Sequence, residues 1–249
     1  MLDLDGVLWR GSKPIPGSAE AVARLRAAGH RVAFLTNNSF STVGELVEKL
    51  GGMGVEAEAD DICNSAQAAA GLLEPGSTAL VVGGPGIVEA LAARDIEVVG
   101  DGRAVDAVVV GFDRTFDFDK LTAAFQAVRD GARLIGTNDD ATFPTARGEI
   151  PGGGAIVAAV AYASGVKAEI AGKPNAAAAK LLVERLGEIT WLVGDRPETD
   201  GGMAVAVGAR FGLVLSGITE SADGSDPEPD AVAPDLATLV EDLLGARTT

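Results

Sequence analysis

Two aspartates, Asp3 and Asp5, stand one residue apart in the opening stretch MLDLDG. Alternate residues of a β-strand point to the same side, so both carboxylates face one substrate if a strand runs through them. One carboxylate can then act as a nucleophile while the other transfers protons. The alternative is a pair of solvated carboxylates in a turn, because D-x-D-G also suits turns.

A second pair of carboxylates, Asp195 and Asp200, lies in WLVGDRPETD. Asp195 ends an apolar strand as Asp3 does, and Asp200 stands where a helix is expected to begin, which also suits an N-cap. Carboxylates gathered at one sheet edge repel one another unless a cation lies between them. We expect Mg²⁺, which prefers oxygen ligands, because His30 and Cys63 are the single histidine and cysteine and make no zinc site.

Groups suited to a phosphate ion follow other predicted strands. The run Thr36, Asn37, Asn38 offers a hydroxyl and backbone N–H groups after the strand RVAFL. Lys173, in the sequence GKP, adds a positive charge just before a helix N-terminus, which itself favours anions. An ordinary exposed lysine is the alternative, but the glycine and proline beside it indicate a fixed turn.

The elements that must position these side chains alternate between short apolar strands and longer, Ala-rich amphipathic helices. This alternation predicts an α/β fold with a largely parallel sheet, in which ligands bind beyond the carboxyl ends of the strands. The strands within residues 78–170 end in different sequences, GGPG and TNDD. We therefore expect them to form a separate sheet, inserted into the first.

Composition excludes several classes of partner. The 249 residues carry 36 acidic and 20 basic side chains, a formal net charge of −16. Such a charge repels nucleic acids and anionic membranes, so neither is expected as a partner. No apolar run reaches the length of about 18 residues that a membrane span needs, and no leader peptide is recognised. A single cysteine cannot form an intrachain disulfide, and we expect a cytoplasmic location.

Four segments, DLDGVL, LTNN, GKPN and GDRPETD, resemble in order the four motifs of the haloacid dehalogenase (HAD) superfamily. The insert between the second and third motifs resembles the cap of class IIA, the NagD-like or 4-nitrophenylphosphatase-like phosphatases. The resemblance implies a Rossmann-like core of residues 1–76 and 172–249 and a smaller α/β cap of residues 77–171. It also implies a Mg²⁺-dependent phosphoric monoester hydrolase.

The resemblance assigns catalytic roles to the acidic residues. Asp3 matches the nucleophile that becomes an aspartyl-phosphate and also contacts Mg²⁺. Asp5 matches the general acid/base, with its backbone carbonyl on Mg²⁺. Asp195 matches a direct Mg²⁺ ligand, and Asp200 matches a second acidic residue oriented around that site. An acid at the position of Asp5 favours phosphoryl transfer over dehalogenation, because the dehalogenases lack it.

Further matches concern the substrate. Thr36, Asn38 and Lys173 match phosphate-binding positions, and Asn37 matches a residue that holds the phosphate or the adjacent loop. In the cap, Phe143 and Arg147 are the expected specificity residues. A histidine stands at the position of Phe143 in related pyridoxal phosphate phosphatases, which speaks against pyridoxal phosphate. The family favours a small metabolite such as glycerol phosphate, another sugar or polyol phosphate, or 4-nitrophenyl phosphate, and a homodimer formed through the cap.

Three other functions compete with a phosphatase. A phosphotransferase or mutase would pass the phosphoryl group to an alcohol, a weakened HAD-fold protein would bind without turnover, and a receiver-like domain would carry the phosphate as a signal. The complete set of acids with Lys173 argues against the second, and the cap-sized insert against the third. Two departures from the family are noted: only two residues precede Asp3, and Pro197 stands where leucine is common.

Overall fold

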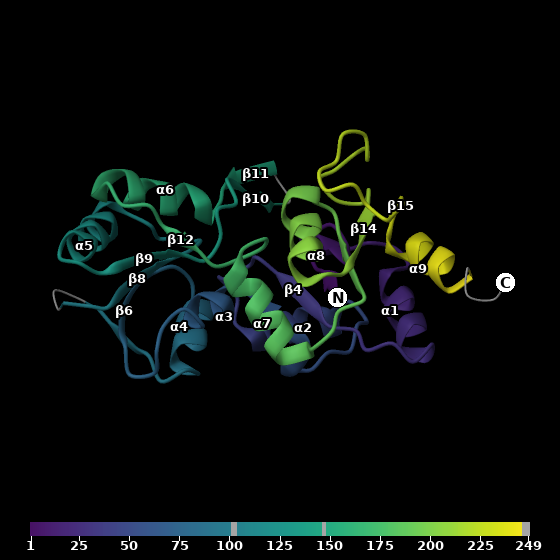
Figure 1. Cartoon of the computed structure of the whole chain (residues 1–249), viewed down its shortest axis with the longest axis horizontal. Helices are drawn as coiled ribbons and strands as arrows, with labels where there is room; N and C mark the ends of the chain where they lie inside the picture. The colour runs from purple at the N-terminus through teal and green to yellow at the C-terminus, as the bar shows by residue number, and fades with distance from the viewer. Residues whose placement is uncertain (101–103, 146–147, 246–249) are drawn as a thin grey trace. The chain divides into compact units, whose positions relative to one another are not determined.

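The computed structural model describes residues 1–100, 104–145 and 148–245, and the chain divides into two compact units (Figure 1). Each unit is described by itself. Unit 1 comprises Met1–Thr36, Gly44–Cys63 and Leu182–Thr249, and unit 2 comprises Asn37–Val43 and Asn64–Leu181.

Unit 1 is built on a six-stranded sheet in the order β15-β14-β13-β1-β4-β5. The strands are β1 (Leu2–Asp3), β4 (Phe34–Thr36), β5 (Ile62–Asn64), β13 (Trp191–Gly194), β14 (Arg210–Val214) and β15 (Ala231–Ala233). The pairings of β1 with β13 and β4, and of β14 with β13 and β15, are parallel. The strands are short and mostly buried, as expected for a parallel sheet covered on both faces.

Helices and a small hairpin complete unit 1. The hairpin pairs β2 (Trp9–Arg10) with β3 (Lys13–Pro14), and α1 packs against α9. On α2 the buried side chains Leu46 and Leu50 form the inward face, four residues apart. The helical segments are α1 (Ser18–Ala27), α2 (Val43–Gly52), η1 (Ala59–Asp61), the π-turn η2 (Pro197–Gly201), α8 (Gly202–Val207) and α9 (Leu236–Gly245). Helix α7 (Ala176–Leu186) is divided between the units, because unit 2 ends at Leu181.

Unit 2 has its own five-stranded parallel sheet, in the order β12-β9-β8-β6-β7. In Figure 1, α5 and α6 lie on one face of this sheet and α3 and α4 on the other. A hairpin of β10 and β11 precedes α6. The elements are α3 (Ser65–Ala70), β6 (Thr78–Val82), α4 (Pro85–Ala92), β7 (Glu97–Val99), β8 (Ala107–Val110), α5 (Phe118–Arg129), β9 (Arg133–Gly136), β10 (Thr142–Thr145), β11 (Gly148–Pro151), α6 (Gly153–Ser164) and β12 (Glu169–Ile170).

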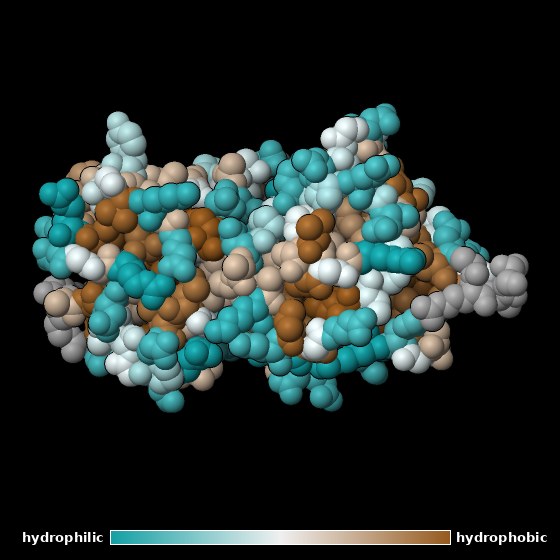
Figure 2. Space-filling model, viewed as in Figure 1, coloured by the Kyte–Doolittle hydropathy of each residue, from teal (hydrophilic) through white to brown (hydrophobic). Residues whose placement is uncertain are grey.

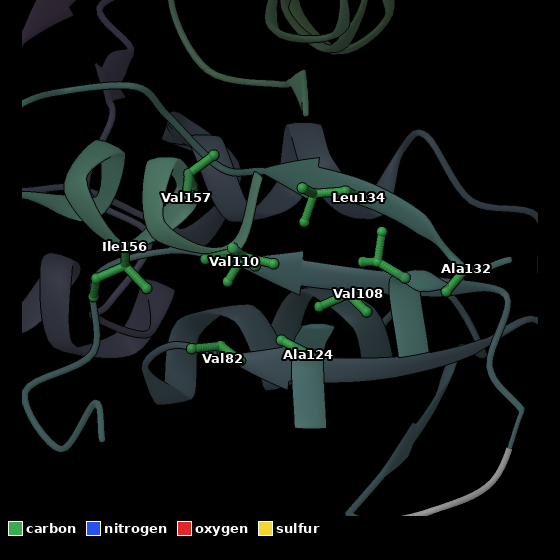
Figure 3. Packing of buried hydrophobic residues seen from close by; sticks show 10 residues of the cluster. Val82, Val108, Val110, Ala124, Ala132, Leu134, Ile156 and Val157 are labelled. Carbon is green, nitrogen blue, oxygen red and sulfur yellow. The ribbon is translucent and has the colours of Figure 1, made fainter. Parts of the chain in front are cut away.

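The core of unit 2 is aliphatic. Val108 and Val110 on β8 are fully buried and point to the same side of the sheet, against Leu134 of β9 and Val157 of α6 (Figure 3). Alanine and valine dominate the cluster, which fits a chain in which only 4% of residues are aromatic. Close packing of such small side chains joins the helices firmly to the sheet.

The structure confirms the predicted α/β class and the separate sheet formed by the strands within residues 78–170. The division by compactness places residues 37–43, 64–76 and 172–181 in unit 2, whereas the predicted core domain includes them. The predicted family boundaries, 1–76 with 172–249 and 77–171, stay a prediction.

On the face shown in Figure 2, hydrophilic residues are interspersed with apolar ones. Among the described residues, no helix has the length and apolar character required to cross a membrane.

Candidate active site

Three aspartates of unit 1 meet at one edge of its sheet. Asp3, Asp195 and Asp200 each offer a carboxylate oxygen, and these atoms all lie within 4.8 Å of one another. The three residues are buried, with 6%, 4% and 1% of their surfaces exposed. We call these residues the acidic cluster. They are three of the four residues predicted to hold a metal ion.

Parallel pairing explains why residues far apart in the sequence meet here. Asp3 is the last residue of β1, and Asp195 directly follows the last residue of β13. Leu2 is paired with Val193, so the two strands end side by side and present their aspartates at the same edge. The predicted convergence of these acids at the carboxyl ends of parallel strands is therefore confirmed.

Asp200 reaches the cluster through an unusual turn. It lies in the five-residue π-turn η2, and its Oδ2 atom accepts hydrogen bonds from the backbone N–H groups of Asp195 and Arg196, both at 3.1 Å. The N-cap of the following helix is Gly201, which makes no side-chain cap. The N-cap interpretation of Asp200 is therefore wrong: its carboxylate reaches back to the end of β13. A side chain at Gly194 would collide with it.

Asp195 is held by a loop that sequence reasoning did not identify. Its Oδ2 atom accepts the backbone N–H of Ile218 at 2.7 Å. Gly6 and Gly217 pack so closely against the carboxylate that a Cβ atom at either position would overlap it. Gly6 also has a φ of 85°, which favours glycine. Gly6 and Gly217 are visible in the sequence, but their contact with Asp195 depends on the tertiary fold and could not be predicted from it.

Asp5 takes a different position from the one the strand argument predicts. Strand β1 ends at Asp3, so the condition for the D-x-D alternation is not met, and the catalytic role of Asp5 stays a prediction. Asp5 instead forms an isolated bridge with Trp9, and its Oδ1 atom accepts the indole N–H of Trp9 at 2.9 Å. Its predicted metal contact is through the backbone carbonyl, and that contact stays a prediction.

A lysine accompanies this pair. The Nζ atom of Lys49 lies 3.9 Å from the centroid of the Trp9 ring, within the range of a cation–π interaction. Burial lowers the pKa of the Lys49 ammonium, and the nearby charge of Asp5 offsets part of that shift. In unit 1, the Lys49 ammonium therefore contacts the Trp9 ring, and the Trp9 N–H contacts the Asp5 carboxyl.

In unit 2, Asn37 joins two of the predicted motifs. Its Oδ1 atom accepts the backbone N–H of Lys173 at 2.8 Å, and its Nδ2 donates to the carbonyl of Lys173 at 3.4 Å. The Asn37 carbonyl accepts from Ser65 Oγ and Asn138 Nδ2, both at 2.7 Å. Of the two roles predicted for Asn37, the structure shows the one that holds the adjacent loop.

Lys173 itself is only 4% exposed, so the alternative of an ordinary surface lysine is wrong. Asn38 uses its Oδ1 atom to accept the backbone N–H groups of Phe40 at 2.9 Å and Ser41 at 3.2 Å, which fixes the turn after the predicted motif. Thr36, in unit 1, is the buried last residue of β4. The phosphate-binding roles of Thr36, Asn38 and Lys173 stay predictions.

Phe143, predicted to contact the substrate, belongs to an aromatic cluster within unit 2. Its ring stacks on Phe112 with centroids 4.9 Å apart and planes at 11°, and Phe40 meets Phe112 edge-on at 5.7 Å. The guanidinium carbon of Arg114 lies 5.9 Å from the ring centroids of both Phe40 and Phe112. The specificity role of Phe143 stays a prediction, and Arg147 lies outside the described residues.

The fold and the acidic cluster together define a class of protein: an α/β protein with hard oxygen ligands at the carboxyl edge of a parallel sheet, suited to a divalent cation. Comparison with known proteins is more specific. The family model of the haloacid dehalogenase-like hydrolases matches residues 1–97, and a second HAD-hydrolase-like model matches residues 170–239. The chain belongs to the haloacid dehalogenase-like hydrolases, as the sequence resemblance implied.

Individual relatives share most of the chain. It is 34% identical over 251 residues to the acid sugar phosphatase of Staphylococcus saprophyticus, covering 98% of this chain and 96% of the relative. It is similar to glycerol phosphate phosphatase of Mycobacterium tuberculosis in complex with magnesium, with TM-score 0.89, 33% identity and coverage of 96% and 75%. It is also similar to p-nitrophenyl phosphatase of Archaeoglobus fulgidus, with TM-score 0.88, 31% identity and coverage of 97% of each chain.

Proposed function

We propose that this protein is a Mg²⁺-dependent phosphatase that hydrolyses small phosphate monoesters through an aspartyl-phosphate intermediate. The observation that carries the proposal is the acidic cluster: three buried carboxylates from β1, the end of β13 and the π-turn, with oxygens within 4.8 Å of one another. The phosphatases among its relatives support the same reaction.

The donor set fits the proposed cation. All three ligand groups in the acidic cluster are carboxylates, which are hard oxygen donors of the kind Mg²⁺ prefers. Three ionised carboxylates this close repel one another, so a divalent cation stabilises their charged forms. When bound, the ion supplies electrostatic stabilisation of the negative charge that a phosphoryl group carries. Asp3, Asp195 and Asp200 would hold it, with the backbone carbonyl of Asp5.

In the first proposed step, a carboxylate oxygen of Asp3 attacks phosphorus in line with the ester oxygen. A P–O bond to Asp3 forms as the bond to the leaving oxygen breaks, and its electron pair stays on that oxygen. The protonated carboxyl of Asp5 gives its proton to the leaving oxygen, so an alcohol departs.

In the second proposed step, water hydrolyses the acyl phosphate. The Asp5 carboxylate, now ionised, takes a proton from the water as its oxygen attacks phosphorus. The bond between phosphorus and Asp3 breaks, which regenerates the carboxylate and releases inorganic phosphate. Two carboxyl groups are needed because Asp3 is esterified while Asp5 exchanges the proton.

The phosphate-binding groups are proposed from the family motifs. Thr36 would bind phosphate oxygens through its hydroxyl, and Lys173 would supply positive charge, with the backbone after Thr36 adding N–H donors. The two hydrogen bonds between Asn37 and the Lys173 backbone support this role, because they fix the loop that carries the lysine. A fixed donor stabilises developing charge without reorganising during the reaction.

Glycerol phosphate and sugar phosphates are the proposed substrate class. The names of the relatives support it, since one is an acid sugar phosphatase and another is a glycerol phosphate phosphatase. We therefore expect polyol and sugar monoesters to be hydrolysed with higher kcat/KM than pyridoxal phosphate. Phe143 argues against recognition of pyridoxal phosphate, because it replaces the histidine of the related pyridoxal phosphate phosphatases.

The test is phosphate release by the purified chain from glycerol 3-phosphate, sugar phosphates, pyridoxal phosphate and 4-nitrophenyl phosphate, with Mg²⁺ and with EDTA. We expect release that requires Mg²⁺ and a covalent phosphoenzyme that is trapped by acid quench and lost in Asp3→Asn. An acceptor alcohol added to the assay detects any transferred phosphoester. Absence of phosphate release from every ester by a folded, Mg²⁺-loaded chain would contradict the proposal.

A further inference from the structure

An aromatic side chain outside the predicted motif roles contacts the proposed acid/base. The indole N–H of Trp9 donates to Asp5 Oδ1 at 2.9 Å, and the Trp9 residue is 1% exposed. A buried indole N–H needs an acceptor, and here a carboxyl oxygen supplies it. A hydrogen bond of this kind restricts the rotation of the carboxyl group about its Cβ–Cγ bond.

The backbone between the two residues brings them together. The N–H of Gly6 donates to the carbonyl of Trp9 at 2.7 Å, while the N–H groups of Leu8 and Trp9 donate to the carbonyl of Leu4 at 2.9 and 3.3 Å. These bonds close a tight loop in which Trp9 returns beside Asp5. The backbone bridge between Asp5 and Trp9 therefore keeps these two residues side by side.

The face of the indole is also occupied. Lys49 Nζ lies 3.9 Å from the ring centroid. Lys49 is on α2, which is anchored by the buried side chains of Leu46 and Leu50. The Trp9 ring is thus held by a cation from a packed helix, with its N–H directed to Asp5.

We infer that Trp9 is a positioning residue: its N–H holds Oδ1 of Asp5 so that Oδ2 faces the leaving oxygen and, later, the attacking water. This inference rests on the proposed function, because it assigns Trp9 to the acid/base step of that reaction. Trp9 itself touches no reacting atom and acts through Asp5.

A positioning role predicts dependence on the leaving group. An alkoxide such as glycerolate is a poor leaving group and needs a proton as the P–O bond breaks, whereas 4-nitrophenolate departs as a stable anion. The ratio kcat/KM reports only the steps up to leaving-group release, so it isolates the acid function of Asp5 from the later hydrolysis. Misplacing Oδ2 should therefore lower kcat/KM for glycerol 3-phosphate far more than for 4-nitrophenyl phosphate.

The first experiment compares Trp9→Phe with Trp191→Phe, which alters the other of the two tryptophans in the chain. We expect Trp9→Phe to lower kcat/KM for glycerol 3-phosphate by about ten- to a hundredfold, the scale of a lost bond to an ionisable group. The value for 4-nitrophenyl phosphate should change several-fold less, and Trp191→Phe should leave the ratio between the two substrates unchanged.

The second experiment separates positioning from packing. In Asp5→Asn, adding Trp9→Phe should cause little further loss, because the group that Trp9 positions has already lost its acid function. If Trp9→Phe does not fold, replacing Trp9 with benzothienylalanine in the Trp191→Phe background removes the N–H and keeps the ring shape. The same selective loss on glycerol 3-phosphate is expected there.

Equal losses on both substrates, or additive losses with Asp5→Asn, would overturn the positioning role and leave Trp9 as a packing residue. Full activity of the benzothienylalanine protein on glycerol 3-phosphate would overturn it as well. A folded wild-type chain that releases no phosphate with Mg²⁺ is a separate result, which overturns the proposed function and with it the role given to Trp9.

Discussion

Buried aspartates occur in both units, and their surroundings differ. In unit 2, Asp113 accepts a hydrogen bond from Lys120 Nζ at 2.6 Å and two from Thr115, both at 2.8 Å. In unit 1, the acidic cluster gathers three carboxylates within 4.8 Å of one another. The carboxylate of Asp113 lies against a lysine ammonium, and the three carboxylates of the acidic cluster lie close to one another.

The difference supports the proposal that the acidic cluster serves catalysis, whereas Asp113 serves the fold. Burial alone raises the pKa of Asp113, but the bonds from Lys120 and Thr115 outweigh burial and lower it, so the charged form is stabilised by folding. The acidic cluster instead adds mutual repulsion, which costs stability and is retained where a cation or a reaction uses it. Asparagine substitutions in the two places should therefore change different quantities, the free energy of unfolding at Asp113 and the catalytic activity in the acidic cluster.

The largest expected effect is on the proposed nucleophile. Asp3→Asn should lower kcat for phosphate release by about a thousandfold or more, as loss of a nucleophile does. Added Mg²⁺ should raise its stability to urea by less than it raises that of the wild type, because the proposed metal site loses one carboxylate. Steady-state assays and urea unfolding measure the two quantities, and a folded variant that keeps the wild-type kcat would contradict this assignment.

The next effect concerns the proposed metal ligand. Asp195→Asn should raise the Mg²⁺ concentration needed for half-maximal activity by about a hundredfold, because a neutral amide is a weaker ligand than a carboxylate. Activity titrations with Mg²⁺ on both proteins check it. An unchanged Mg²⁺ requirement would remove Asp195 from the metal site.

A smaller loss is expected from crowding the same carboxylate. Gly217→Ala places a Cβ atom where the Asp195 carboxylate lies, so activity should fall about tenfold as the ligand shifts. The matched control is Gly44→Ala on α2, where a Cβ meets nothing within 4 Å. That control should keep full activity and gain slightly in stability. Equal activity of the two variants would show that the contact is unimportant.

The smallest effect on activity is expected in unit 2. Asp113→Asn should lower the free energy of unfolding by about 1–3 kcal/mol at neutral pH, because the Lys120 partner loses its counter-charge. Asp113 has a lowered pKa when folded, so its contribution is full above the ordinary pKa of about 3.8 and is lost as pH falls through the folded value. Urea unfolding of both proteins at several pH values should show the difference shrinking in acid, while turnover stays close to wild type.

The convergence of the acids could be predicted from the sequence, because it follows from a general rule. Apolar strands alternating with helices predict a parallel sheet, and Asp3 and Asp195 both stand at the ends of such strands. The different sequences that end the strands within residues 78–170 also separate those strands from the rest. These features depend on local patterns that repeat across many α/β chains.

Contacts that depend on loop closure could not be predicted in the same way. The π-turn that carries Asp200 has no sequence signature beyond its proline and glycines, so an N-cap was an equally valid interpretation. Trp9 could be predicted as apolar, but its bond to Asp5 depends on the loop that returns to Leu4. The backbone of Lys173 is likewise held by Asn37, which is distant in the sequence.

Binding of Mg²⁺ in the absence of substrate tests the central claim most directly. In isothermal titration calorimetry, we expect the wild-type chain and Asp113→Asn to bind one Mg²⁺ ion with similar affinity, and Asp195→Asn to lose most of that affinity. Such a result would assign the ion to the acidic cluster of unit 1. Equal Mg²⁺ binding by the wild type and Asp195→Asn, or no binding by a wild-type chain that still releases phosphate, would contradict it.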